Sequence, residues 1–361
     1  MLINVNYFVL LFKISDKFYL GAAIFVPSVK DRFLSMLINS SDYISGESAS
    51  KALGVSRAAV NSAVMSLRND GYGIDSSTNR GYLLTNRPDR LDHGGIGAFL
   101  PDDRMDLITV LPVVDSTNTY CKDLARKGAP SGTVVISDCQ TGGKGRRGRT
   151  FLSPSGVGLY LSYLMRPDSG IDKISEITCW TAVAVCEAIR DCYGIDSQIK
   201  WVNDVLMNRK KICGILTEAS FEAESGTIDS LVIGIGINVN EKRSDFPEEL
   251  DNIATSVSIE NGGKTFMRSE LAAALIKRLD ALASSWPDSH EGYLDSYRRH
   301  CITPGNRIAA YTTVAGESEA RTGEALSIGS DFSLEVRFDG SDAITSLKSG
   351  EVSVRGLYGY T

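Results

Sequence analysis

The sequence predicts a multidomain α+β protein with a helix-turn-helix unit first, a mixed α/β unit in the middle and a small β-barrel last. Its 361 residues provide material for two or three domains at roughly 100 to 200 residues each. The spacing of apolar residues changes twice along the chain, from helical, to alternating strands and helices, to short strands. With 43% hydrophobic and 23% charged residues, the composition is that of a soluble globular protein.

Charge and cysteine content narrow the class further. The chain has 38 basic and 44 acidic residues, a formal charge of −6, so no overall positive field favours nucleic acid and any DNA contact must be local. The seven cysteines are an odd number without a C-x-x-C pair, and there are three histidines. A disulfide framework and a metal site built from these residues are both disfavoured, and a reducing cytoplasm is the expected location.

Residues 1–29 are expected to be an appendage of unknown role. The apolar stretch 7–12 has the character of a signal-peptide core, but no basic residue precedes it and no A-x-A cleavage site follows. Lys13, Asp16 and Lys17 interrupt it well short of the ~20 apolar residues that a membrane helix needs. A membrane anchor is therefore disfavoured.

Residues 30–86 are predicted to form a winged helix. An amphipathic helix at 30–40 precedes two short helices that are separated by Gly54, and Ser56 is the expected N-cap of the second. Two short helices meeting through a glycine-containing turn form a helix-turn-helix. Two short β-segments around the turn-rich stretch 76–80 are expected to add the wing.

The second helix of this pair is expected to contact DNA through polar side chains on its outer face. These are Ser56, Arg57, Asn61, Ser62 and Arg68. Residues 31–88 contain six basic and five acidic residues, so one copy should bind DNA weakly and a dimer is implied. A small helical bundle with an accidental turn is the alternative.

A linker is expected at residues 86–97, followed by an α/β domain at 98–302. Its predicted strands are 107–114, 133–139, 158–165, 198–201, 205–207, 211–222 and 227–239, and its predicted helices are 116–127, 174–192 and 266–300. Because the late strands follow one another directly, the sheet should be mixed. Residues 303–361 carry short strands and Gly/Asp turns, which are typical of a small β-barrel.

The most informative motif is the glycine-rich basic loop Gly142–Arg149. Its four glycines let the backbone wrap closely around a ligand, and Lys144, Arg146, Arg147 and Arg149 supply charge, so the loop suits a phosphate. It is not a Walker A loop, which requires Gly-x-x-x-x-Gly-Lys-Ser/Thr. The loop should be mobile until an anion arrives. A solvated basic linker that binds nucleic acid nonspecifically is the alternative.

The segment K-W-V-N-D, Lys200–Asp204, is expected at a strand-to-strand turn where polar side chains converge. Asn203 and Asp204 lie in it, and Lys211 opens the next strand, where a point charge would suit a phosphate or an acyl-phosphate oxygen. A hairpin with solvated lysines would explain the same pattern.

Two further motifs carry polar or glycine residues. In D-S-T-N, residues 115–118, Ser116 or Thr117 is expected to cap the next helix, and capping alone would explain the motif. G-I-G-I-N, residues 234–238, lacks the spacing of a dinucleotide fingerprint, so its glycines are expected to let something flat lie against the strand.

Taken in order, these motifs closely resemble those of the biotin protein ligases. The resemblance spans roughly residues 30–361 and is carried by D-S-T-N, Q-T-G-G-K-G-R-R-G-R, K-W-V-N-D, R-K-K-I-C-G-I-L-T-E, G-I-G-I-N and G-E-V-S-V-R. With the helix-turn-helix in front, the chain is similar to the bifunctional, repressor-type members. The resemblance implies a winged helix, a class II synthetase-like catalytic domain with a mixed sheet, and an SH3-like C-terminal barrel.

The resemblance also implies an activity and partners. A biotin–[acetyl-CoA-carboxylase] ligase joins biotin and ATP, with Mg²⁺, into biotinyl-5′-AMP. It then passes biotin to a lysine of a biotin carboxyl carrier protein. Repression implies operator DNA of biotin genes and a homodimer promoted by ligand. The alternatives are a DNA-binding regulator that senses biotinyl-AMP without turnover, and a ligase whose winged helix is vestigial.

Residue roles follow from the resemblance. The residues implied for biotin are Ser116, Thr117, Asn118, Gln140, Gly143, Arg146, Lys211, Gly214 and Gly234. Those implied for ATP or the adenylate are Lys144, Arg146, Arg147, Arg149, Phe151, Asn203, Gly236 and Asn238. Arg146 would cover the biotin carboxylate and the AMP phosphate, Lys211 would stabilise the α-phosphate and acyl oxygen, and Asp204 would orient the attacking groups or a metal.

Three positions depart from the family pattern. Lys144 stands where arginine is usual and loses a bidentate fork. Phe151 replaces a tryptophan expected to stack on adenine, which weakens stacking. Val202 replaces the proline of K-W-P-N-D. None of the three removes a charged group that the chemistry requires.

Overall fold

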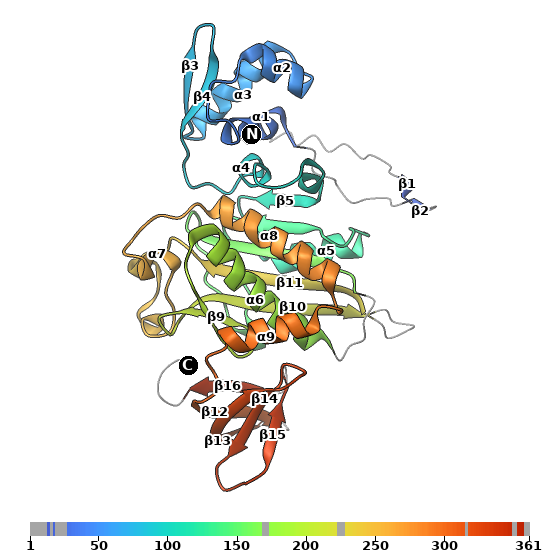
Figure 1. The fold of residues 1–361 in the computed structure, drawn as a ribbon, viewed down its shortest axis with the longest axis vertical. Helices are drawn as coiled ribbons and strands as arrows, with labels where there is room; N and C mark the ends of the chain where they lie inside the picture. The colour runs from blue at the N-terminus through green and yellow to red at the C-terminus, as the bar shows by residue number, and fades with distance from the viewer. Residues whose placement is uncertain are drawn as a thin grey trace.

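The computed structural model describes residues 13–14, 17–18, 27–167, 173–221, 228–314, 317–348 and 352–356. Three parts follow one another along its long axis, with a helical unit at one end, a large sheet in the middle and a small sheet at the other end (Figure 1). The apolar stretch 7–12 lies outside the described residues. Within them, no helix combines the length and apolar character needed to cross a membrane.

The N-terminal unit has the predicted helices and wing. Its elements are α1 (Val29–Ile38), α2 (Gly46–Leu53), α3 (Arg57–Asn69), β3 (Gly73–Ser77) and β4 (Gly81–Asn86). The expected local signals are in place, because Gly54 ends α2 in the left-handed region at φ 67° and the Ser56 side chain accepts from the Ala59 N–H. The apolar faces of the three helices enclose their own core, which includes Phe33, Val60 and Leu67.

The expected linker contains a buried helix, α4 (His93–Gly97). In this helix, Gly94 allows α4 to pack directly on α1. A Cβ on Gly94 would lie 2.5 Å from the Asp31 carbonyl oxygen, and the Ser35 hydroxyl donates to the Gly94 carbonyl at 2.8 Å. The winged helix is therefore packed onto the next unit, with α4 also contacting α8.

The central sheet is mixed, as predicted. Its seven strands are β5 (Ile108–Leu111), β6 (Val134–Ser137), β7 (Gly158–Met165), β8 (Gln198–Lys200), β9 (Asp204–Met207), β10 (Lys210–Phe221) and β11 (Ile228–Asn238). They lie in the order β5-β6-β7-β11-β10-β9-β8, in which β5 and β6 are parallel and every other pair is antiparallel.

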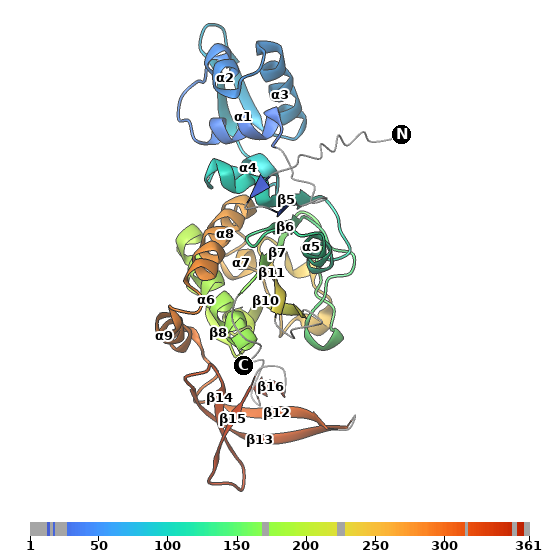
Figure 2. The same ribbon diagram turned by 90° about the vertical axis from the view of Figure 1, so that its right-hand side faces the viewer.

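Helices cover both faces of this sheet. The remaining elements of the central part are α5 (Thr117–Arg126), α6 (Ile174–Tyr193), α7 (Val257–Glu260), α8 (Arg268–Ser285), α9 (His290–His300) and the short turns η1 (Asp102–Leu107), η2 (Arg146–Gly148), η4 (Arg243–Asp245) and η5 (Glu248–Leu250). Helices α6 and α8 lie on one face and α5 lies on the other (Figure 2). The predicted helix 266–300 is divided into α8 and α9 around Pro287.

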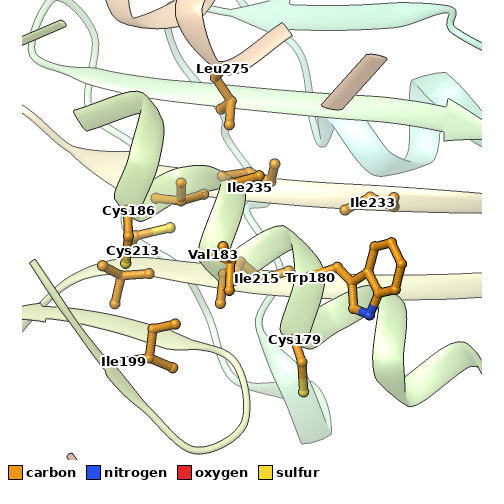
Figure 3. Close-up of a cluster of buried hydrophobic side chains, with 14 of the residues drawn as sticks. Cys179, Trp180, Val183, Cys186, Ile199, Cys213, Ile215, Ile233, Ile235 and Leu275 are labelled. Atoms are coloured by element: carbon orange, nitrogen blue, oxygen red, sulfur yellow. The ribbon is translucent and has the colours of Figure 1, made fainter. Parts of the chain in front are cut away.

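Strand alternation sends β10 and β11 side chains to opposite faces. Ile215, Ile233 and Ile235 pack against Trp180 and Val183 of α6 in the main core (Figure 3). The intervening residues of both strands, glycines among them, therefore face α5. Because glycine has no side chain, the α5 face of the sheet is recessed at these positions.

The C-terminal part is an antiparallel sheet. Its strands are β12 (Arg307–Val314), β13 (Glu317–Ile328), β14 (Leu334–Phe338), β15 (Ile344–Leu347) and β16 (Val352–Gly356). They lie in the order β15-β14-β13-β12-β16, and among the described residues β15 and β16 do not pair, so the strands form an open sheet and the predicted closed barrel is not observed. The Trp201 indole donates to the Phe332 carbonyl at 2.9 Å and attaches this sheet to the central part.

Candidate functional site

A pocket lies on the α5 face of the sheet, between the start of α5 and the basic loop. Its lining residues are Ser116, Thr117, Asn118, Gln140, Lys144, Gly145, Arg146, Phe151, Asn203, Lys211, Gly214, Ile215, Leu216, Gly234, Ile235 and Gly236. They come from four motifs that are far apart in sequence. Twelve of these sixteen residues are among those predicted for biotin, ATP or catalysis, and the other four are Gly145, Ile215, Leu216 and Ile235.

Glycines of β10 and β11 form the floor of the pocket. Gly214 pairs with Gly236 in the sheet register, two residues along from the pair Leu216 and Gly234. A Cβ on Gly236 would lie 2.6 Å from the Phe151 ring, and a Cβ on Gly234 would overlap the Asn118 amide. In the structure, a ring and an amide of the protein itself therefore lie directly on these glycines.

One end of the pocket is a network of neutral hydrogen-bonding groups. The Gln140 Oε1 accepts from the Thr117 backbone N–H at 2.9 Å and from the Thr117 hydroxyl at 3.1 Å. The Gln140 Nε2 donates to the Ser153 hydroxyl at 2.9 Å. Ser116 occupies the N-cap position of α5 without a side-chain capping bond, so the expected serine cap is wrong and the Gln140 side chain takes that place.

The same network contains residues that the sequence reasoning missed. The Ser162 hydroxyl donates to the Asn118 Oδ1 at 2.6 Å, and its oxygen lies 2.8 Å from the Thr117 Oγ1. The Asn118 Nδ2 donates to a Glu218 oxygen at 2.8 Å, and Lys122 Nζ donates to the other oxygen at 2.7 Å. Strand parity was the available signal, because Glu218 has the parity of Gly214 and Ser162 is the polar residue of an otherwise apolar strand.

The basic loop is folded back on itself by backbone hydrogen bonds. The Phe151 N–H donates to the Gly143 carbonyl at 3.0 Å, and the Gly145 N–H donates to the Arg149 carbonyl at 2.7 Å. Arg147 lies in the left-handed region at φ 57°, inside the short η2 turn. Arg147 and Arg149 are exposed and do not line the pocket, whereas Lys144 and Arg146 do.

Arg146 connects the loop to the K-W-V-N-D turn. Its Nη1 donates to the Asn203 Oδ1 at 2.8 Å, and the Asn203 Nδ2 donates to the Ile215 carbonyl at 2.9 Å. Burial lowers the pKa of the Arg146 guanidinium from its ordinary value, and the charge of Asp204 opposes that shift. A guanidinium keeps its charge despite such a shift, so this end of the pocket carries a fixed cation.

Lys211 and Asp204 form an ion pair at the same end. The Lys211 Nζ lies 2.7 Å from an Asp204 carboxylate oxygen, with 23% and 15% of the two side chains exposed. Asp204 does not itself line the pocket, but its partner does. The arrangement holds an ammonium at the pocket wall, next to Gly214 of the floor, where a Cβ would lie 3.0 Å from the Lys211 Nζ.

Two predicted positions are placed elsewhere. The Asn238 Nδ2 donates to the Thr255 carbonyl at 2.9 Å, in a buried contact beyond the pocket. The Gly143 backbone lies beneath Phe151, where a Cβ would overlap the Phe151 carbonyl oxygen. Neither residue lines the pocket.

Among the described residues, no group of three or more His, Cys, Asp or Glu side chains could hold a metal ion. Asp204 is nevertheless a carboxylate beside the cationic end of the pocket. A magnesium ion shared with nucleotide phosphates needs only one or two protein carboxylates. The donor set therefore fits an ion that arrives with a nucleotide.

On the winged helix, the outer face of α3 is only partly as predicted. Asn61 and Ser62 are exposed, whereas the Ser56 hydroxyl serves as the helix cap. Arg57 is exposed and lies 2.5 Å from the Glu47 carboxylate. The expectation that Arg68 is free for DNA is wrong, because its guanidinium donates to the Ile74 carbonyl at 2.7 Å and holds the wing.

Comparison with known proteins identifies the family. A model of the biotin/lipoate A/B protein ligase family matches residues 110–238, and a model of an HTH domain matches residues 30–83. The bifunctional ligase/repressor BirA of Bacillus subtilis strain 168 is 42% identical over 224 residues, which are 62% of this chain and 68% of the relative. The chain belongs to the biotin protein ligase family.

Other members of the biotin protein ligase family support the assignment. The bifunctional ligase/repressor BirA of Escherichia coli K12 is 32% identical over 248 residues, 69% of this chain and 74% of the relative. A solved biotin protein ligase from Aquifex aeolicus, in complex with biotin and ATP, is 28% identical with a TM-score of 0.58. The match covers 69% of this chain and 98% of that structure.

Proposed function

We propose that this family member is a biotin protein ligase that forms biotinyl-5′-AMP from biotin and ATP and passes biotin to a lysine of a carboxyl carrier protein. The observation that carries the proposal is the polarity of the pocket. One end holds neutral donors and acceptors around Gln140 and Asn118, and the other end holds the Arg146 and Lys211 cations. Biotin has a neutral cyclic urea at one end and a carboxylate at the other, which matches this order.

In the first step a biotin carboxylate oxygen attacks the α-phosphorus of ATP, the bond to the bridging oxygen breaks and pyrophosphate leaves. Two anions must approach each other, so fixed positive charge is needed. Arg146 and Lys211 both line the pocket, which supports this role for them. We assign Arg146 to the biotin carboxylate and the phosphate, and Lys211 to the α-phosphate and acyl oxygen.

In the second step the carrier lysine, as a neutral amine, attacks the acyl carbon and AMP leaves, while the amine proton passes to solvent. The mixed anhydride must be shielded from water before this transfer. The loop Gly142–Arg149 borders the pocket and carries Arg146, so it supplies the cover. Phe151, which lies on Gly236, is assigned to the adenine ring by stacking.

Magnesium, when bound with ATP, would neutralise phosphate charge. Asp204 is the residue that would hold it, with Asn203 nearby as a further oxygen donor. Lys144, Arg147 and Arg149 would add charge around the phosphates.

We also propose a repressor role with operator DNA of biotin genes as the partner and a homodimer promoted by biotinyl-AMP as the binding form. The exposed outer face of α3, with Arg57 and Asn61, supports DNA contact. A vestigial winged helix is the alternative.

The proposed boundaries of the three domains are 30–86, 98–302 and 303–361, after the appendage 1–29. We propose an SH3-like form for the last domain.

All seven cysteines are free thiols, which suits the reducing cytoplasm proposed as the location.

The test of the ligase function uses the full chain with labelled biotin, ATP and Mg²⁺. Biotinyl-AMP should form first, and label should then move to a lysine of an added biotin carboxyl carrier protein. Ligand binding without either product would favour a regulator that has lost catalysis.

A further inference from the structure

We propose that Glu218 is a positioning residue that fixes the hydrogen-bonding polarity of the neutral end of the pocket. This inference rests on the proposed function, because it takes the neutral end to receive the biotin head. Glu218 lies on β10, outside the pocket lining, and acts through the Asn118 side chain. Its two carboxylate oxygens serve different donors, Lys122 Nζ at 2.7 Å and Asn118 Nδ2 at 2.8 Å.

The charge state of Glu218 makes it an acceptor only. Burial alone would raise its pKa, but the hydrogen bonds from Lys122 and Asn118 hold the pKa below the ordinary value for glutamate. The carboxylate is therefore ionised at neutral pH, and an ionised carboxylate has no proton to donate. The Asn118 amide must turn its Nδ2 towards Glu218, in agreement with a second, longer contact of 3.3 Å to the Leu216 carbonyl.

The orientation of Asn118 decides what the rest of the network can do. With its Nδ2 held by Glu218, the Asn118 Oδ1 faces Ser162, whose hydroxyl is the donor in a 2.6 Å contact. From the other side, the Thr117 backbone N–H turns the Gln140 Oε1 inward. The network thus presents acceptor oxygens where a cyclic urea has two N–H donors, and a reversed Asn118 amide would oppose those donors with another donor.

Lys122 provides a direct test of this reasoning. In Glu218→Gln the side chain keeps one acceptor for two donors, and the charged Lys122 should take it. The amide nitrogen of the substituted side chain then faces Asn118 and reverses it. In the double variant Glu218→Gln/Lys122→Met the acceptor is free to return to Asn118, so the original polarity should be restored.

The experiment measures biotin-dependent exchange between ATP and pyrophosphate on the full chain, with biotin and ATP varied in turn. We expect Glu218→Gln to raise the KM for biotin about tenfold, the order for a buried donor without its acceptor. The kcat and the KM for ATP should change little, because the loss lies in binding biotin. Lys122→Met alone should raise the KM for biotin less than Glu218→Gln does, because Asn118 keeps its acceptor, and the double variant should recover most of the KM for biotin.

Glu218→Ala is a second measure, since its side chain cannot reach Asn118 and Lys122→Met should not rescue it. Thermal melting of every variant separates misfolding from altered binding. An unchanged KM for biotin in Glu218→Gln, a double variant as weak as the single one, or equal rescue of Glu218→Ala would overturn the assignment. Failure of the proposed function looks different, because the wild type itself would then show no biotin-dependent exchange.

Discussion

Lys211 places a positive charge on the pocket wall, where an ion pair with Asp204 holds it. The Lys211 ammonium sits 2.7 Å from its partner and borders the pocket, so charge that develops on a phosphate or acyl oxygen would meet it. Loss of one such electrostatic contact typically costs ~10²- to 10³-fold in rate. We therefore predict a loss of that size in biotinyl-AMP formation by Lys211→Ala, measured by pyrophosphate exchange.

The neighbouring lysine provides a matched control for this prediction. Lys210 Nζ donates to the Asp251 carbonyl at 2.9 Å, and Lys210 is not part of the pocket lining. Lys210→Ala should therefore retain activity. If Lys211→Ala kept activity within about threefold of the wild type, on the same scale of effects, the catalytic assignment of Lys211 would be wrong.

Glu241 is a buried carboxylic acid, and its burial should make the free energy of unfolding depend on pH. It is 2% exposed, neither carboxylate oxygen meets a hydrogen-bonding side chain among the described residues, and burial raises its pKa to about 7. Because the folded state favours the protonated form, its stabilising effect is full below about pH 4.5 and declines as the pH rises to about 7.

We predict that Glu241→Gln removes this pH dependence. At pH 8 the variant should be more stable than the wild type by on the order of 3 kcal/mol, the free-energy equivalent of the pKa difference, whereas at pH 4.5 the two should be similar. Thermal and denaturant unfolding between pH 4.5 and 9 would measure the difference. The exposed Glu249→Gln serves as control. Equal stability of Glu241→Gln and the wild type at pH 8 would contradict the prediction.

At the scale of elements, two glycines of strand β11 mark two regions of the pocket floor. Gly234 lies under the Asn118 amide and Gly236 lies under the Phe151 ring, two residues further along the same strand. A methyl group on either glycine must displace its own neighbour. The two substitutions should therefore affect different substrates, although both change the same strand by one methyl group.

We predict that Gly234→Ala raises chiefly the KM for biotin and that Gly236→Ala raises chiefly the KM for ATP, each by about tenfold or more, the order for a lost fit of one to a few kcal/mol. Pyrophosphate exchange with each substrate varied in turn measures both constants. Each variant controls for the other, because they differ only in position. An equal effect of both substitutions on both constants would mean that the floor is not divided in this way.

Elements that depend on local chemistry were predictable from the sequence. The Gly54 turn and the Ser56 cap depend on residues next to one another, and the structure has both as predicted. Helix α4 was missed because Gly94 breaks helices on average, and only its contact with α1 explains its place. The prediction that Arg68 is free to contact DNA was wrong because it also ignored a contact between elements. The Arg68 guanidinium donates to a backbone carbonyl of the wing.

Within the site, the sequence predicted twelve of the sixteen lining residues but not their connections. Motifs indicated the glycine floor, Arg146 and Lys211, because each is a local pattern with a chemical meaning. The bond between Glu218 and Asn118 joins residues 100 positions apart in the chain. Such a bond requires the strand order of the sheet, and no local pattern encodes it.

For the whole molecule, Arg268 joins the connection to the winged helix with the sheet that carries the site. It is 1% exposed, and its guanidinium binds Asp89 at 2.7 Å and Asp138 at 2.8 Å. Asp89 precedes α4, whereas Asp138 lies two residues before Gln140 of the pocket. The DNA-binding unit is thus attached by a buried ion network, and α3 lies at the opposite end of the molecule from the C-terminal sheet (Figure 1).

This separation allows DNA binding and ligase activity to be tested independently. Arg57 is exposed on α3 and held by Glu47 at 2.5 Å, while the pocket lies in the central part. A phosphate can compete for an exposed guanidinium, because an exposed ion pair contributes little stability. The same contact predicts opposite effects for its two partners.

We predict that Arg57→Ala weakens binding to a palindromic operator with ligase turnover unchanged, whereas Glu47→Gln strengthens binding by freeing Arg57 and removing a negative charge. Each dimer would lose two phosphate contacts in Arg57→Ala, so the slope of log affinity against log salt should fall by about two. Gel-shift titrations at several salt concentrations, with and without biotin and ATP, measure this slope, and sedimentation measures the dimer. Since ligand and DNA would both favour the dimer, adding ligand should raise DNA affinity. Normal operator binding by Arg57→Ala would leave the winged helix a relic.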